Sequence, residues 1–183
     1  MVAVRRSRPA PRRAYVLETL IKANGWTLGC ELGVFRGDTF KYLVQNCPDL
    51  VLVGIDTWEH PLVEAADPGF RSYSEHDLEG YLAHLDKWAL NYAQRARLVR
   101  GDTVRVLDAL QGYEFDFVFI DADHTYEGAH RDITAAFRRV RHGGMILGHD
   151  YNPGDFPGVV RAVDEHFGAD ALKFADHVWG AWI

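Results

Sequence analysis

The sequence predicts an α/β fold, in which a mostly parallel sheet is doubly wound with helices on both faces. Short apolar runs that end at turn residues alternate along the chain with longer stretches of helical spacing. The apolar runs are continuous, which is typical of strands buried on both faces in a parallel sheet. Alternating strands and helices favour right-handed crossovers and a ligand crevice at the carboxyl ends of the strands.

Seven strands are expected in this sheet. The first five are apolar runs, most of them ended by glycine or an acid, and two more follow near the end of the chain. Asp176-His177 lies between these last two strands as a tight turn, so they are expected to pair antiparallel. The expected strands are 27–32, 50–55, 96–100, 115–120, 144–147, 171–174 and 178–183.

Helices are expected in the intervening stretches. Asn24-Gly25 is typical of a helix end, and Pro48 ends the second helical stretch. In the third stretch aromatic residues and leucines recur at helical spacing. The expected helices are 15–24, 39–46, 78–94, 103–110, 126–140 and 159–167.

Length and composition indicate one globular domain. The 183 residues are 48% apolar and 25% charged, which is ordinary globular usage. We expect a flexible, arginine-rich tail over 1–13 and a single domain over 14–183. The tail either remains solvated or orders over bound substrate. Within the domain, 58–95 is interpreted as an insertion that serves as lid and acceptor region, because long loops in compact domains are usually functional or mobile.

Charge and hydropathy exclude several classes of partner. The formal net charge of −6 argues against nucleic acid as an obligate partner. No run approaches 18 apolar residues and no secretory signal begins the chain, so we expect no membrane partner and a cytoplasmic location. Cys30 and Cys47 are too few for a disulfide framework. A short chain with a long insertion favours a homodimer as its protein partner.

Acidic residues gather where the expected strands end. Glu31 lies in the first strand, Asp56 ends the second, Asp102 follows the third, Asp121 ends the fourth and Asp150 follows the fifth. A lone acid at such a place is as often a turn former or helix cap as a ligand group. Five carboxylates at one edge repel one another unless a cation or hydrogen-bond donors hold them. The pattern therefore predicts a ligand crevice.

A glycine loop follows the first strand and opens a helix. Gly33 and Gly37 permit a tight turn and a close approach to a ligand, and the helix N-terminus offers free N–H groups. The full three-glycine dinucleotide fingerprint is missing, which argues against an oxidoreductase with a nicotinamide cofactor. Asp56 lies about 20 residues further on, where doubly wound folds hold an acid against ribose hydroxyls. The combination favours a ribose-bearing ligand without a pyrophosphate.

Five segments together resemble motifs I to V of class I S-adenosylmethionine-dependent methyltransferases. They are ELGVFRG, GIDTW, RGDTVRVL, FVFIDADHTYEGAHRDI and GGMILGHDY, in that order, within about residues 27–151. They are most similar to small bacterial O-methyltransferases of the macrocin and catechol types, and the last two segments are the most specific. The resemblance implies a Rossmann-like methyltransferase fold whose seven-stranded sheet is mostly parallel with an antiparallel last strand. It also implies S-adenosyl-L-methionine as cofactor and a small-molecule acceptor, such as a sugar, a phenol or a natural product.

The resemblance implies roles for individual residues. Glu31 and the backbone around Gly33 would contact the methionine end of the cofactor, and Asp56 would accept both ribose hydroxyls. Trp58 either stacks on adenine or packs in the core. Carboxylates suit these positions because they accept hydrogen bonds without titrating. The other cofactor-binding residues would be Gly37, Thr57, Asp102 and Thr103 at the loop and the adenine edge, and Asp121.

The catechol-type branch implies a divalent cation at this edge. Its ligands would be Asp121, which ends the fourth strand, and the pair His149-Asp150 after the fifth. Oxygen ligands suit Mg²⁺, whereas the imidazole shifts the preference toward Mn²⁺, Fe²⁺ or Zn²⁺. Such an ion would lower the pKa of a bound hydroxyl and orient it.

Without a metal, His124 or His149 would act as a general base. His124 could instead cap the next helix. We therefore take Asp121, His124 and His149 as the candidate catalytic residues, and read Arg131 and Asp132 as a surface pair. The alternative function is a non-catalytic nucleoside-binding module on the same fold.

Overall fold

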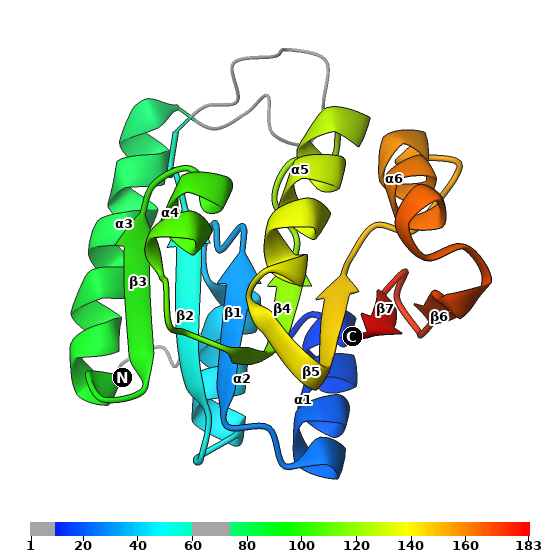
Figure 1. Cartoon of the computed structure of the whole chain (residues 1–183). Coiled ribbons are helices and arrows are strands. Elements are labelled where there is room, and N and C mark those ends of the chain that lie inside the picture. Colours follow the sequence, from blue (N-terminus) through cyan, green and yellow to red (C-terminus); the bar gives the residue numbers. More distant parts are fainter. Residues whose placement is uncertain (1–9, 60–73) are drawn as a thin grey trace.

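The computed structural model describes residues 10–59 and 74–183, and these form one seven-stranded sheet with helices on both faces (Figure 1). The strands are β1 (Leu28–Leu32), β2 (Val51–Asp56), β3 (Ala96–Arg100), β4 (Phe115–Ile120), β5 (Val140–Gly148), β6 (Leu172–Lys173) and β7 (Trp179–Trp182). Their order across the sheet is β3-β2-β1-β4-β5-β7-β6. The first five strands are parallel, and β7 is antiparallel to both β5 and β6. The predicted fold is confirmed.

The strand order places the ligand crevice at the centre of the sheet. From β1 the chain winds outward through β2 to β3, and it then returns to β4 on the other side of β1. Open α/β sheets bind ligands at such a reversal, beyond the carboxyl ends of the strands. The ligand crevice is therefore expected over the ends of β1 and β4, which are neighbours in the sheet (Figure 1).

The helices form two layers, each packed on one face of the sheet. One layer consists of α1 (Arg12–Asn24), α2 (Asp38–Asn46) and α3 (Glu75–Ala89), and the other of α4 (Thr103–Ala109), α5 (Tyr126–Phe137) and α6 (Pro157–Phe167) (Figure 1). Each layer has its own cluster of buried apolar side chains against the sheet. Two short 3₁₀ segments, Leu90–Tyr92 and Gly168–Asp170, complete the described helices. None of the helices in the described residues is long and apolar enough to cross a membrane.

Helix α1 begins earlier than predicted. It starts at Arg12, directly after Pro11, so Arg12 and Arg13 belong to the first turn of a packed helix and the predicted boundary of a flexible tail at 13 is wrong. Arginine has a good helix propensity, and the buried residues Ala14 and Leu17 anchor this turn to the sheet. The remainder of the predicted tail, 1–9, lies outside the described residues.

The predicted insertion is in part an ordinary crossover. Helix α3 connects β2 to β3, begins at a capping box of Ser74 and Asp77, and buries Leu78 and Leu85 against its layer. Residues 60–73, which form part of the predicted lid and acceptor region, lie outside the described residues.

The last hairpin has the turn that the sequence predicts. Asp176 and His177 both have positive φ, 58° and 56°, as a two-residue type I′ turn requires. The strands it joins are shorter than expected, since β6 has only two residues.

Candidate active site

Asp56 holds the glycine loop that follows β1. Its Oδ2 accepts hydrogen bonds from the backbone N–H groups of Val34 (2.8 Å) and Phe35 (2.7 Å), and its Oδ1 accepts one from Trp58 (2.7 Å). Burial raises the pKa of Asp56, although these backbone hydrogen bonds oppose that shift. Asp56 therefore fixes the backbone of the loop next to which the resemblance places the ribose.

Gly33 brings this loop against the end of β4. Its φ is +86°, and a Cβ at this position would lie 2.1 Å from the carbonyl oxygen of Asp121. Gly37 also has positive φ (+71°) and packs against Leu85. Only glycine satisfies both the backbone conformation and the close approach at Gly33.

Trp58 is buried in the core. Its side chain is 1% exposed, and its Nε1 donates to the carbonyl oxygen of Phe35 at 2.9 Å. Of the two roles considered for Trp58, the structure shows packing beneath the loop. Its neighbour Thr57 accepts a hydrogen bond from Nε of Arg100 at its carbonyl oxygen (3.0 Å). The hydrogen bonds of Trp58 and Thr57 thus fix the chain directly after β2 against the glycine loop and β3.

The predicted adenine edge contains a buried acid that the sequence did not reveal. Asp102 caps α4 by accepting from the N–H of Arg105 (3.0 Å), and Thr103 donates its hydroxyl hydrogen to Asp132 on α5. Asp132 is 1% exposed, so the interpretation of Arg131 and Asp132 as a surface pair is wrong. Asp132 lies on the face of α5 that packs on the sheet, whereas Arg131 contacts Asp102 (Nη2 to Oδ2, 3.4 Å).

Asp132 is expected to make stability depend on pH. Burial raises its pKa to about 7, against the hydrogen bond from Thr103 and the nearby charge of Arg131, which lower it. Since the folded state keeps this proton between about pH 4 and 7 while the unfolded state loses it, stability falls as pH rises through that window. Asp132→Asn should remove up to about 1.4 kcal/mol per pH unit of this slope. Urea unfolding of wild type and Asp132→Asn at about pH 5 and about pH 7.5 measures how the free energy of unfolding changes with pH. The same change with pH in the two proteins would contradict the prediction.

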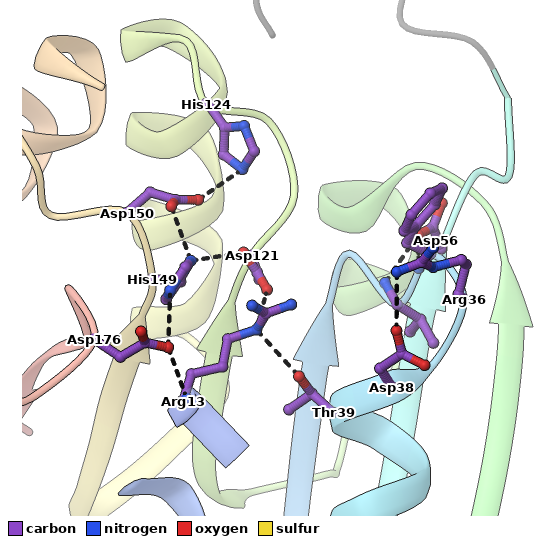
Figure 2. A network of polar contacts seen from close by, with 12 residues as sticks. Arg13, Arg36, Asp38, Thr39, Asp56, Asp121, His124, His149, Asp150 and Asp176 are labelled. Atoms are coloured by element: carbon purple, nitrogen blue, oxygen red, sulfur yellow. Dashed lines mark hydrogen bonds and ion pairs between the residues drawn. The ribbon is translucent and has the colours of Figure 1, made fainter. Parts of the chain in front are cut away.

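Four side chains from two strand ends form a His–Asp cluster (Figure 2). Nδ1 of His149 lies 2.9 Å from Oδ1 of Asp150 and 3.5 Å from Oδ1 of Asp121. Nε2 of His124 lies 2.9 Å from Oδ2 of Asp150. All four side chains are between 11% and 15% exposed. The two carboxylates are thus mostly buried, and each contacts at least one imidazole.

The cluster perturbs the ionisation of its members. Burial opposes a charge on His149, but the carboxylates of Asp121 and Asp150 outweigh it and raise the pKa of His149 to about 9. Burial would raise the pKa of Asp150, yet contacts with His124 and His149 hold it well below its usual range. The carboxylate of Asp150 is therefore held ionised by the neighbouring imidazoles.

The described residues offer one group of three side chains that could hold a metal ion. One ligand atom each of Asp121, His124 and Asp150 lie within 4.8 Å of one another. The predicted ligand set had His149 in the place of His124. In the structure His149 lies beside the same two carboxylates, with its Nε2 3.8 Å from Asp176 Oδ2. Two carboxylates and one imidazole suit a divalent cation.

Sequence reasoning missed Arg13, Thr39 and Asp176, which complete the crevice (Figure 2). Nε of Arg13 lies 3.0 Å from Oδ2 of Asp121 and donates to Oγ1 of Thr39 at 3.1 Å. The backbone N–H of Arg13 donates to Oδ2 of Asp176 at 2.9 Å. Arg13 resembled part of a solvated basic tail and Asp176 a turn residue, so neither carried a signal of function.

Glu31 lies buried beneath this crevice. It is 2% exposed, and its Oε2 has no hydrogen-bond partner among the described residues. Burial raises the pKa of Glu31 well above its usual range, the charge of Asp121 adds to this, and the charge of Arg13 opposes it. A buried carboxyl oxygen without a donor is costly, so a ligand that supplies an N–H group would satisfy it.

A family model described as "Methyltransferase domain" matches residues 30–151, about two thirds of the chain. The chain belongs to this family. The matched segment of the methyltransferase contains Glu31, the glycine loop, Asp56 and the His–Asp cluster, but neither Arg13 nor Asp176. No curated protein matches the chain at a significant level.

Solved structures of methyltransferases share its fold. The O-methyltransferase TomG from Streptomyces achromogenes, in complex with S-adenosylmethionine, is 18% identical, with a TM-score of 0.64 over 96% of this chain and 81% of TomG. An O-methyltransferase from Bacillus cereus in complex with S-adenosylhomocysteine is 17% identical, with a TM-score of 0.59 over 96% of this chain and 83% of that one. CalS11, a TDP-rhamnose 3′-O-methyltransferase of calicheamicin biosynthesis, is 18% identical, with a TM-score of 0.61 over 94% and 81%.

Proposed function

We propose that this methyltransferase transfers the methyl group of S-adenosylmethionine to a hydroxyl oxygen of a small molecule. The observation that carries the proposal is the position of Asp121. One oxygen of its carboxylate contacts Arg13, which also contacts Thr39 at the start of α2. The other oxygen contacts His149 of the His–Asp cluster. The cofactor side and the acceptor side of the reaction therefore meet at this residue. The O-methyltransferases of the same fold support this choice of acceptor atom.

The chain's own groups suit the parts of the cofactor. In this proposal the loop held by Asp56 would receive the ribose, Asp102 and Thr103 would contact the adenine, and the buried Glu31 would face the methionine end. The cofactor supplies a methyl group on a positively charged sulfur. The crevice that receives it is lined by acids, which favour a cationic ligand.

The transfer itself needs one bond to form and one to break. The acceptor oxygen forms a bond to the methyl carbon while the carbon–sulfur bond breaks, and that electron pair remains on sulfur in S-adenosylhomocysteine. Without a bound metal ion, the hydroxyl proton passes to the imidazole of His124, whose Nε2 lies 2.9 Å from Oδ2 of Asp150, because Asp121 and Asp150 keep His149 protonated at neutral pH. If His124 instead binds a metal ion, the proton would leave to solvent water.

We further propose that a divalent cation assists this step. The donors of Asp121, His124 and Asp150 fit such an ion, because they converge within 4.8 Å and combine two carboxylates with an imidazole. Mn²⁺, Fe²⁺, Zn²⁺ or Mg²⁺ there would lower the pKa of an acceptor hydroxyl.

The test is methyl transfer from S-adenosylmethionine carrying a labelled methyl group. The purified protein is incubated with panels of catechols, phenols and sugar nucleotides, with Mn²⁺ or Mg²⁺ and with EDTA. We expect label in at least one hydroxylated acceptor and loss of at least about tenfold in rate with EDTA. Failure to bind S-adenosylhomocysteine would overturn the assignment, whereas tight binding with no transfer to any acceptor would favour the non-catalytic module.

The metal ligands are tested separately by calorimetric titration with Mn²⁺. His124→Ala should weaken Mn²⁺ binding at least about tenfold. His142→Ala is the matched control, because His142 is exposed and lies in the first half of β5, away from the cluster. Equal Mn²⁺ affinity in the two variants would remove His124 from the ligand set.

A further inference from the structure

Arg13 reaches from the first turn of α1 into the space between β4 and α2 (Figure 2). Its Nε contacts both Asp121 and Thr39, and its backbone N–H is held by Asp176. The side chain is 28% exposed, so it borders the crevice without being sealed into the core. The end of β4 and helix α2 thus fix the guanidinium group, and the turn at Asp176 fixes the backbone of the same residue.

Much of this guanidinium remains available to a ligand. Among residues 10–59 and 74–183, the hydrogen bonds and ion pairs of the Arg13 side chain are made by Nε. Both terminal nitrogens therefore have N–H groups without a described partner. A planar fork of N–H donors is the group that proteins use to bind carboxylates in bidentate fashion.

Glu31 provides the complementary group. Its Oε2 is buried without a donor among the described residues, and the charges of both Asp121 and Arg13 act on its carboxyl group from the neighbouring elements. A carboxyl oxygen and a guanidinium at the same end of the glycine loop match a ligand that carries both an ammonium and a carboxylate. That combination is the α-amino acid group.

We propose that Arg13 binds the α-carboxylate of the cofactor's methionine end, while Glu31 accepts a hydrogen bond from its α-ammonium. This inference rests on the proposed function, because it assumes S-adenosylmethionine as the ligand. Arg13 lies outside residues 30–151, so the family segment alone does not supply this contact.

The negative charges around the crevice make a cation at Arg13 important for binding the cofactor's carboxylate. The carboxylates of Asp121 and Asp56 attract the cofactor's sulfonium and ammonium, but they repel its α-carboxylate. Arg13 is a permanent cation beside Asp121 and offsets that repulsion locally. Loss of Arg13 should therefore affect ligands that carry the carboxylate and spare those that lack it.

The experiment compares ligands by isothermal titration calorimetry of wild type and Arg13→Gln. S-adenosylhomocysteine should bind Arg13→Gln about 10-fold to 100-fold more weakly, as for loss of a charge-assisted hydrogen bond. 5′-Methylthioadenosine, which lacks the amino acid group, should bind both proteins within about twofold. Wild type should prefer S-adenosylmethionine to its decarboxylated analogue, and Arg13→Gln should lose this preference.

Arg12→Gln is the matched control, because Arg12 is the exposed neighbour in the same helical turn. It should bind all four ligands as wild type does. Equal weakening of S-adenosylhomocysteine and 5′-methylthioadenosine by Arg13→Gln would overturn the inference and assign Arg13 to structure alone. Unchanged S-adenosylhomocysteine binding in Arg13→Gln would also overturn it, while failure of wild type to bind S-adenosylhomocysteine would overturn the proposed function.

Discussion

Replacing Asp56 with alanine is expected to weaken S-adenosylhomocysteine binding by at least about 100-fold. The change removes the proposed acceptor of the ribose hydroxyls. It also leaves the backbone N–H groups of Val34, Phe35 and Trp58 without their acceptor, so the glycine loop loses its fixed shape. Calorimetric titration measures the affinity, and urea unfolding measures the accompanying loss of stability.

Asp49→Ala is the control for this experiment. Asp49 is exposed and precedes β2, at the opposite end of the strand that Asp56 closes. Its replacement should leave the affinity within about twofold of wild type. If Asp56→Ala bound S-adenosylhomocysteine as wild type does, the ribose assignment would be wrong.

The second large effect is expected at Asp121. Asp121→Ala should lower the rate of methyl transfer by about 10²-fold to 10⁴-fold, the usual range for a lost acid–base group. It should also weaken Mn²⁺ binding, since Asp121 belongs to the three-residue group that could hold a metal. Binding of 5′-methylthioadenosine should change little, because this ligand lacks the part of the cofactor that lies toward Asp121. Single-turnover rates and calorimetry separate these effects.

Asp123→Ala distinguishes a specific role from a general loss of negative charge. Asp123 is exposed, two residues beyond Asp121 on the same loop, and accepts a hydrogen bond from the N–H of Thr125. We expect a decrease in rate of less than about tenfold for this variant. Similar losses in both variants would show that Asp121 has no special part in the chemistry.

The sheet and its acidic edge could be predicted because local patterns decide them. Continuous apolar runs between helices imply parallel strands, and parallel strands of a doubly wound sheet end at one edge. Glu31 and Asp121, 90 positions apart in the sequence, could therefore be placed together before any coordinates, and their strands are indeed neighbours with Glu31 paired to Phe119. The order of the strands in the sheet therefore brings the two acids together, although no local feature of either acid indicates that they are close.

Other residues could not be predicted because their meaning depends on distant partners. Arg13 is one of several arginines near the start of the chain, and only its contacts with Asp121 and Thr39 distinguish it. Asp132 follows Arg131 in a helix, as exposed ion pairs often do, yet its side chain faces Thr103 on another helix. His124 and His149 were both candidate catalytic residues. Which imidazole converges with Asp121 and Asp150 as a possible metal ligand depends on loop geometry, which hydrophobic periodicity does not encode.

The hydrogen bond from Arg13 to Asp176 joins positions that are 163 residues apart. During synthesis, a chain that has emerged only as far as residue 151 already carries every family motif. It still lacks the carboxylate that anchors the first turn of α1 and approaches His149. The final hairpin must therefore be synthesised before Asp176 can contact Arg13 and the crevice can assemble fully. A nascent or prematurely terminated chain would contain the motifs of a methyltransferase without a fully assembled site.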